Sequence, residues 1–107
     1  MKILVTGSGG FVGRELVSEL KNRKHDVTEF DLDEGKNILN KKHLKENLNQ
    51  IDLVIHLAAI IDNNNPNLWK VNVEGTKNII EECARSRVKK FILLSSTGVY
   101  GNASITL

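Results

Sequence analysis

The stretch "KILVTGSGGFVG", residues 2–13, decides the fold of this chain. Its first residues are mostly aliphatic or β-branched and stop at a glycine, which is typical of a short strand buried on both faces. Three glycines then follow at a Gly-x-x-Gly-x-x-Gly spacing, Gly7, Gly10 and Gly13. From residue 11 to residue 23, apolar side chains recur at helical spacing. The stretch therefore predicts a strand, a tight glycine turn and an amphipathic helix.

Each glycine of this turn has a physical use if the turn holds a phosphate ligand. Gly7 permits the tight turn, Gly10 lets the backbone approach a pyrophosphate, and Gly13 lets the helix lie close to the strand. The backbone N–H groups of Phe11 and Val12 open the helix without partners inside it, so they are expected to point at phosphate oxygens. Structural turns also use glycine triplets, so the interpretation depends on the flanking strand and helix.

The rest of the chain alternates between strand and helix patterns. Strands are predicted at residues 26–30, 36–40 (a brief one), 51–59 and 88–94, and helices at residues 40–48 and 67–85. The strands are nearly uniformly apolar, which is typical of parallel strands joined by right-handed βαβ crossovers. We therefore expect an α/β fold, a Rossmann-type parallel sheet of order 3-2-1-4-5 with helices on both faces. Its ligand site would lie between strands one and four.

An acidic residue stands at the end of the second predicted strand. Asp31 occupies the position from which a carboxylate accepts hydrogen bonds from an adenosine ribose, although a solvated aspartate in a polar turn gives the same pattern. Its charge would repel a 2′-phosphate, and no arginine lies between Asp31 and Lys41 to offset this repulsion. The pattern favours NAD over NADP, while Lys36 leaves NADP open.

Composition excludes several other classes of protein. The 107 residues are enough for one domain, and 15 basic against 13 acidic residues with only 5% aromatics give no argument for nucleic acid. Cys83 is the only cysteine, so it forms no intrachain disulfide, and we expect it buried in a helix. No apolar run is long enough to cross a membrane, and the N-terminal residues lead into a strand instead of a signal peptide. A cytoplasmic location is expected.

Four stretches, in this order, resemble the extended short-chain dehydrogenases of the NAD-dependent nucleotide-sugar epimerase and dehydratase type. They are "TGSGGFVG", "DLVIHLAA", "NVEGTKNIIEECARS" and "FILLSSTGVYG". The resemblance implies that Leu57, Ala58 and Ala59 line the cofactor near its nicotinamide half. It further implies that Asn72 holds the backbone beside the site and that Ser96 is the catalytic hydroxyl. Taken singly, Asn72 could face solvent and Ser96 could form a turn.

Four further residues are interpreted beside this resemblance. Relatives usually carry an aspartate near the adenine, where this chain has Asn37 and Ile38, and an amide can still hydrogen-bond there. His56 is interpreted as a half-buried core histidine and not as a ligand or base. Tyr100 belongs to the turn after the last strand and is not the catalytic tyrosine of the family.

The family's chemistry requires a tyrosine followed four residues later by a lysine, which lowers the pKa of the tyrosine for proton transfer. The only tyrosine here, Tyr100, is followed at that distance by Ser104. We therefore expect residues 1–107 to form a truncated NAD-binding Rossmann domain of an enzyme acting on a nucleotide sugar, with the substrate domain absent and no activity alone.

Two alternatives remain open at this point. One is a non-catalytic dinucleotide-binding or regulatory module, and the other is a fragment of a split enzyme that needs a second chain. The last predicted strand would be left as an exposed edge, which favours a homo-oligomer or a complementing chain.

Overall fold

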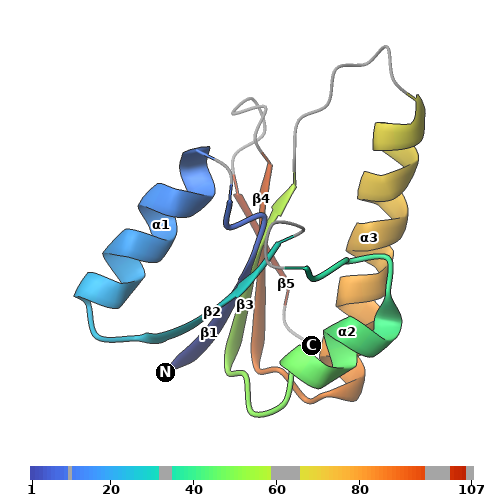
Figure 1. Ribbon diagram of the computed structural model, residues 1–107. Coiled ribbons are helices and arrows are strands. Elements are labelled where there is room, and N and C mark those ends of the chain that lie inside the picture. The colour runs from blue at the N-terminus through green and yellow to red at the C-terminus, as the bar shows by residue number, and fades with distance from the viewer. Residues whose placement is uncertain (10, 32–34, 59–65, 96–101, 106–107) are drawn as a thin grey trace.

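The computed structural model describes residues 1–9, 11–31, 35–58, 66–95 and 102–105 (Figure 1). In chain order the elements are β1 (Lys2–Thr6), α1 (Phe11–Asn22), β2 (Asp26–Phe30), α2 (Lys41–Asn47), β3 (Leu53–Ala58), α3 (Pro66–Arg85), β4 (Lys90–Ser95) and β5 (Asn102–Ile105). The strands of this part of the chain form one sheet in the order β2-β1-β3-β4-β5. Figure 1 shows α1 on one face of the sheet and α2 and α3 on the other. The expected fold class is confirmed.

The sheet is apolar on both faces, as parallel strands covered by helices require. Ile3 and Val5 of β1 pack with Val17 of α1 and with Ile55 of β3. Leu4, between them in the sequence, belongs to the larger core on the α2 and α3 side. The other buried members of that core are Phe30, Leu44, Leu48, Ile51, Val54, Ile79, Cys83, Val88 and Phe91. The alternation along β1 therefore fixes which helix covers which face.

The brief third strand expected at residues 36–40 does not form. The segment turns instead, because the side-chain oxygen of Asn37 accepts the N–H of Leu39 at 2.9 Å and its carbonyl accepts the N–H of Asn40 at 2.9 Å. Asn40 then caps α2 by accepting two backbone N–H groups of the first helical turn, as its sequence position predicted. Asparagine side chains that bond to the nearby backbone compete with strand pairing. The sheet therefore lacks the outermost strand of the expected order 3-2-1-4-5, the one at residues 36–40.

The expectation of an open edge at the last predicted strand is also wrong. β5 pairs antiparallel with β4, from Phe91 opposite Ile105 to Leu94 opposite Asn102. The sequence Asn-Ala-Ser-Ile of β5 is too short and too polar to show a strand pattern by itself. The edge of β4 is thus covered, and an exposed β4 no longer argues for a partner chain.

The register of the three neighbouring strands places their carboxyl ends together. Thr6, the last residue of β1, lies opposite Phe30, the last residue of β2, and opposite His56 near the end of β3. In a parallel sheet of this kind, ligands bind outside the carboxyl ends of the strands, where the chain connections diverge to opposite faces. Here the connection after β1 leads to α1 on one face, and β3 leads toward α3 on the other (Figure 1).

Candidate functional site

The turn after β1 is held by both neighbouring strands. Gly7 has a φ of +71°, in the left-handed region that favours glycine, and its N–H donates to the carbonyl of Phe30 at 3.1 Å. A Cβ atom at Gly7 would lie 3.0 Å from the carbonyl oxygen of Leu57. Gly7 is therefore required both by its backbone conformation and by the close approach of β3.

The first turn of α1 lies directly against the glycine turn. A Cβ atom at Gly13 would lie 2.3 Å from the carbonyl oxygen of Gly7 and 2.8 Å from the Cα of Ser8. The close approach that we expected at Gly13 is present. Ser8 itself is buried, a feature that the sequence did not indicate. Gly10 lies outside the described residues.

The start of α1 has the properties of an anion site. Phe11 and Val12 are its first two residues, so their backbone N–H groups have no acceptor within the helix. Their side chains are exposed, by 85% and 56%, so neither is committed to the core. The positive end of the helix dipole and these N–H groups are therefore placed beside the glycine turn, where a phosphate would be favoured.

The carboxylate of Asp31 contacts the glycine turn. Asp31 follows β2 directly, is half-buried, and accepts the N–H of Gly9 on Oδ2 at 3.0 Å. The backbone N–H of Lys36 donates to the Asp31 carbonyl at 3.1 Å, and the Lys36 ammonium donates to the carbonyl of Glu29 at 2.9 Å. One of the three donors of this ammonium is thus already engaged with β2. Lys36 is therefore a weaker candidate for a 2′-phosphate than its position in the sequence suggested.

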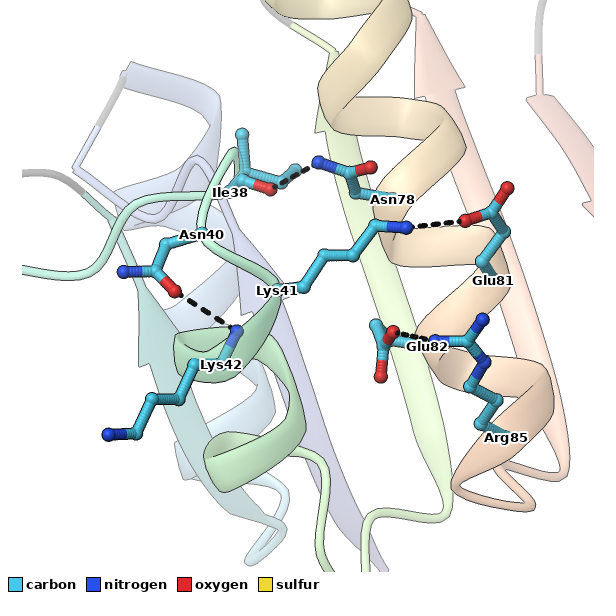
Figure 2. A network of polar contacts seen from close by, with 8 residues as sticks. All are labelled: Ile38, Asn40, Lys41, Lys42, Asn78, Glu81, Glu82 and Arg85. Atoms are coloured by element: carbon cyan, nitrogen blue, oxygen red, sulfur yellow. Dashed lines mark hydrogen bonds and ion pairs between the residues drawn. The ribbon is translucent and has the colours of Figure 1, made fainter.

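The segment with Asn37 and Ile38 is fixed by α3. A Cβ atom at Gly75 would lie 2.7 Å from the Cγ2 of Ile38, so this side chain packs directly onto the helix backbone. Figure 2 shows the side-chain amide of Asn78 donating to the Ile38 carbonyl, at 3.4 Å. The side-chain oxygen of Asn37 already accepts the N–H of Leu39. The adenine contact expected of Asn37 and Ile38 therefore stays a prediction, and it would use the amide nitrogen or the second lone pair of Asn37.

An ion pair also joins α2 to α3, and a second pair lies within α3. The ammonium of Lys41 lies 3.0 Å from a carboxylate oxygen of Glu81, and the guanidinium of Arg85 lies 2.8 Å from the buried carboxylate of Glu82 (Figure 2). The Lys41 ammonium, through its hydrogen bond and its charge, lowers the pKa of Glu81. Because α2 follows the segment that contains Asn37, the Lys41–Glu81 pair restrains that segment from its other side.

The end of β3 lies beside the glycine turn. Leu57 packs into the core on the α1 side, and its backbone N–H donates to the hydroxyl of Thr6 at 3.2 Å. Ala58 is the last residue of β3 and lies opposite Ser95 of β4. Leu57 therefore lies beside the glycine turn, while its expected place along the nicotinamide half of a cofactor stays a prediction.

The side chains of three further predicted site residues are not described by the structure. Asn72 lies in α3, and only its backbone is described. Ala59 and Ser96 lie outside the described residues. Their roles near the nicotinamide and at the catalytic hydroxyl stay predictions.

His56 is more deeply placed than the half-buried position that the sequence suggested. It is 5% exposed, and its ring lies between the hydroxyls of Thr6, at 2.5 Å from Nδ1, and Thr76, at 2.9 Å from Nε2. Burial lowers its pKa from 6.5 to about 4, so the ring is neutral at physiological pH. The sequence signal for this contact was a polar residue near the carboxyl end of each of two apolar strands, which the parallel register then pairs.

The described residues give no support for two other kinds of site. Within them, no group of three or more His, Cys, Asp or Glu side chains could hold a metal ion. No helix in this part of the chain is both long and apolar enough to cross a membrane.

Comparisons with known proteins agree with this geometry. The model of the NAD dependent epimerase/dehydratase family matches residues 3–106, and the chain belongs to that family. The resemblance stated from the four motifs is therefore confirmed. The chain is 34% identical to the UDP-N-acetyl-alpha-D-glucosaminuronate decarboxylase of Bacillus cytotoxicus, over 96% of this chain and 39% of that protein. It is 33% identical to the decarboxylating sterol-4-alpha-carboxylate 3-dehydrogenase of Mus musculus, over 92% of this chain and 30% of that protein.

A solved structure extends the comparison to three dimensions. A short-chain dehydrogenase/reductase superfamily protein from Agrobacterium tumefaciens, crystallised with bound NAD, matches with a TM-score of 0.80 and 31% identity. The match covers 94% of this chain and 34% of that one. The chain thus spans between 30% and 39% of the lengths of these three relatives.

Proposed function

We propose that this chain is the NAD-binding part of a nucleotide-sugar epimerase/dehydratase-like protein. The observation that carries the proposal is the 3.0 Å hydrogen bond from the N–H of Gly9 to the carboxylate of Asp31. It joins the end of β2 to the glycine turn, so a group able to hold a ribose lies beside a group able to hold a pyrophosphate. The close backbone approaches at Gly7 and Gly13 hold this turn against the end of β3 and the start of α1.

Each part of the dinucleotide has candidate residues in this proposal. The pyrophosphate would accept from the backbone N–H groups of Phe11 and Val12 beside Gly10, and the adenosine ribose would donate to Asp31. The adenine would meet the segment of Asn37 and Ile38. The nicotinamide half would lie near the end of β3 and the start of α3, at Leu57, Ala58, Ala59 and Asn72. Bound there, the nicotinamide ring would supply a hydride acceptor for a substrate carbon.

The substrate and the reaction rest on the motif resemblance. One relative is named for a UDP-sugar acid and another, at nearly the same identity, for a sterol carboxylate, so identity over this segment does not choose between the two substrate classes. The nucleotide-sugar class is proposed because all four motifs resemble that type of enzyme. Ser96 is proposed to hold the reacting substrate oxygen by a hydrogen bond.

Turnover is proposed to need more than these residues supply. Proton transfer from the substrate hydroxyl would use a tyrosine and a lysine four residues apart, and these 107 residues contain no such pair. We therefore expect the chain by itself to bind NAD without converting a nucleotide sugar. Neither a regulatory module nor a split-enzyme fragment has an observation that favours it over this proposal.

The test is a calorimetric titration of the wild-type chain, of Asp31→Asn and of Asp26→Asn with NAD and NADP. Asn keeps an acceptor for the N–H of Gly9 but removes the charge, so NAD binding should weaken by about tenfold or more, since bonds to charged groups contribute roughly 1.5–3 kcal/mol. The preference of Asp31→Asn for NAD over NADP should be smaller than that of the wild type as well. Asp26 is exposed at the opposite end of β2, so Asp26→Asn should bind like the wild type. Unchanged binding by Asp31→Asn, or no NAD binding by the wild type, contradicts the proposal.

A further inference from the structure

A largely buried series of hydrogen bonds runs through the sheet beside the glycine turn. The hydroxyl of Thr6, the ring of His56 and the hydroxyl of Thr76 are joined in that order, over 2.5 Å and 2.9 Å. Thr6 is 2% exposed and His56 is 5% exposed. The three side chains come from β1, β3 and α3, so the contacts link elements that are 50 and 20 residues apart in the sequence.

The two partners of the Thr6 hydroxyl favour one arrangement of the protons in this series. The Thr6 hydroxyl already accepts the N–H of Leu57 at 3.2 Å, and its own hydrogen is then free for Nδ1 of His56. With Nδ1 as acceptor, the neutral ring carries its hydrogen on Nε2 and donates it to Thr76. The ring also packs against Phe91, with the two ring centroids 6.1 Å apart, which limits its rotation. The arrangement requires a neutral histidine and does not use it as an acid or base.

Each end of this hydrogen-bond series lies next to a part of the candidate site. Thr6 is the residue before Gly7, and the Leu57 carbonyl is the atom that a Cβ at Gly7 would meet at 3.0 Å. Thr76 lies one helical turn after Asn72, on the same side of α3. The hydrogen bonds of His56 therefore set the spacing between the glycine turn, the end of β3 and the start of α3.

We propose that His56 is a positioning residue for the cofactor site, which acts through Thr6 on the glycine turn and through Thr76 on α3. The inference rests on the proposed function, since it concerns the binding of NAD. Its consequence is that a loss of these hydrogen bonds weakens NAD binding by more than a general loss of stability does. Where β1 and β3 are free to shift apart, the pyrophosphate side and the nicotinamide side of the site no longer keep the spacing that one ligand spans.

The experiment compares Thr6→Val with Thr6→Ser, and Thr76→Val with Thr76→Ser. Valine has the shape of threonine without the hydroxyl, so Thr6→Val leaves Nδ1 of His56 and the N–H of Leu57 without their partner. The dissociation constant for NAD should rise at least about tenfold in Thr6→Val and by a smaller factor in Thr76→Val, because Thr76 is partly exposed and water can replace its hydroxyl. The serine variants keep the hydroxyl and should bind within about twofold of the wild type.

A matched control separates positioning from stability. Val54 is fully buried in the core on the α2 and α3 side and makes none of these hydrogen bonds, so Val54→Ala should lower the midpoint of thermal unfolding without raising the dissociation constant comparably. If Val54→Ala weakens NAD binding as much as Thr6→Val does at a similar loss of stability, the positioning role is overturned.

The remaining outcomes also decide the question. If the wild type binds no NAD, the proposed function fails and the inference fails with it. If the wild type binds NAD and both valine variants bind equally well, the inference alone is overturned. If Thr6→Val does not fold, Thr76→Val carries the comparison, together with the nitrogen NMR spectrum of His56 in the wild type. That spectrum should show the hydrogen on Nε2, and a hydrogen on Nδ1 contradicts the proposed arrangement.

Discussion

The two ends of the parallel sheet are tied together by different means. At the amino end, Asp52 accepts the backbone N–H of Lys2 on its carboxylate at 2.8 Å and the N–H groups of Lys89 and Lys90 on its carbonyl at 3.1 and 3.2 Å. These ties join the starts of β1, β3 and β4 near solvent, with the Asp52 side chain 35% exposed. At the carboxyl end, the ties run through the nearly fully buried His56.

This difference separates stability from binding. The amino end uses a charged group close to water, and the ammonium of Lys89 lies 3.8 Å from the Asp52 carboxylate, a distance at which solvent and salt screen the attraction. At the carboxyl end, neutral groups in the interior tie β1, β3 and α3 together, and a glycine turn and a helix start lie beside them. We therefore expect changes at the carboxyl end to affect NAD binding first, and changes at the amino end to affect only stability.

The largest expected effect is that of Gly13→Ala. A methyl group there would lie 2.3 Å from the carbonyl oxygen of Gly7 and 2.8 Å from the Cα of Ser8, and these are backbone atoms that cannot move aside as a flexible side chain could. The helix must shift from the turn, which should cost about 3 kcal/mol or more of unfolding free energy and abolish detectable NAD binding. Urea denaturation and titration calorimetry measure the two effects.

Gly35→Ala is the matched control for this substitution. Gly35, unlike Gly13, has a positive φ, of +73°, but a Cβ atom there would meet nothing within 4 Å. The cost should be limited to backbone strain, about 1–2 kcal/mol, with NAD still bound. If Gly13→Ala costs no more than Gly35→Ala, the close packing of α1 on the turn is not the reason for the glycine.

The sequence predicted most of the fold because its signals were local. The apolar runs of the parallel strands, the amphipathic helices and the N-cap at Asn40 each depend on residues a few positions apart. The brief strand at residues 36–40 failed for a local reason too, since the Asn37 side chain closes a turn in place of strand pairing. β5 could not be predicted, because its four residues gain their pairing only from β4.

The site was predictable where one residue type has one physical use. The glycine spacing indicated the tight turn, and Asp31 at the end of a strand indicated an acceptor beside it, which the structure places on the N–H of Gly9. The depth of His56 was not predictable, because its partners Thr6 and Thr76 are distant in sequence and become neighbours only through the register of β1 and β3 and the packing of α3.

The next effect in size is a pH dependence of stability that comes from His56. Burial lowers the pKa of His56 to about 4, from 6.5 when unfolded. Between these values the unfolded chain binds a proton that the folded chain does not, so the free energy of unfolding rises with pH across this window. The contribution is fully present above pH 6.5 and is lost as the pH falls to 4, by roughly 3 kcal/mol in all. Urea denaturation at several pH values measures it.

The control for the pH dependence is His56→Asn, which keeps a hydrogen-bonding group for Thr6 and cannot titrate. This variant should be less stable than the wild type at pH 7, and its stability should change less between pH 6.5 and pH 4.5. Carboxylates titrate in both proteins, so the difference between the two curves isolates the histidine. Parallel curves for the wild type and the variant contradict a buried neutral His56.

The smallest expected effect belongs to the amino end, at Asp52. The backbone N–H of Lys2, which Asp52 accepts, holds the pKa of this carboxyl below its ordinary value, against an opposing effect of burial. Asp52→Ala removes the acceptor, but water can reach the exposed N–H of Lys2, and the Asp52 carbonyl still binds the N–H groups of Lys89 and Lys90. We expect a loss of stability smaller than that of Gly13→Ala, a lower sensitivity of stability to salt than in the wild type, and unchanged NAD affinity. Thermal unfolding at low and high salt with a parallel NAD titration measures all three. A weakening of NAD binding by Asp52→Ala as large as that by Asp31→Asn would show that the two ends of the sheet are not independent.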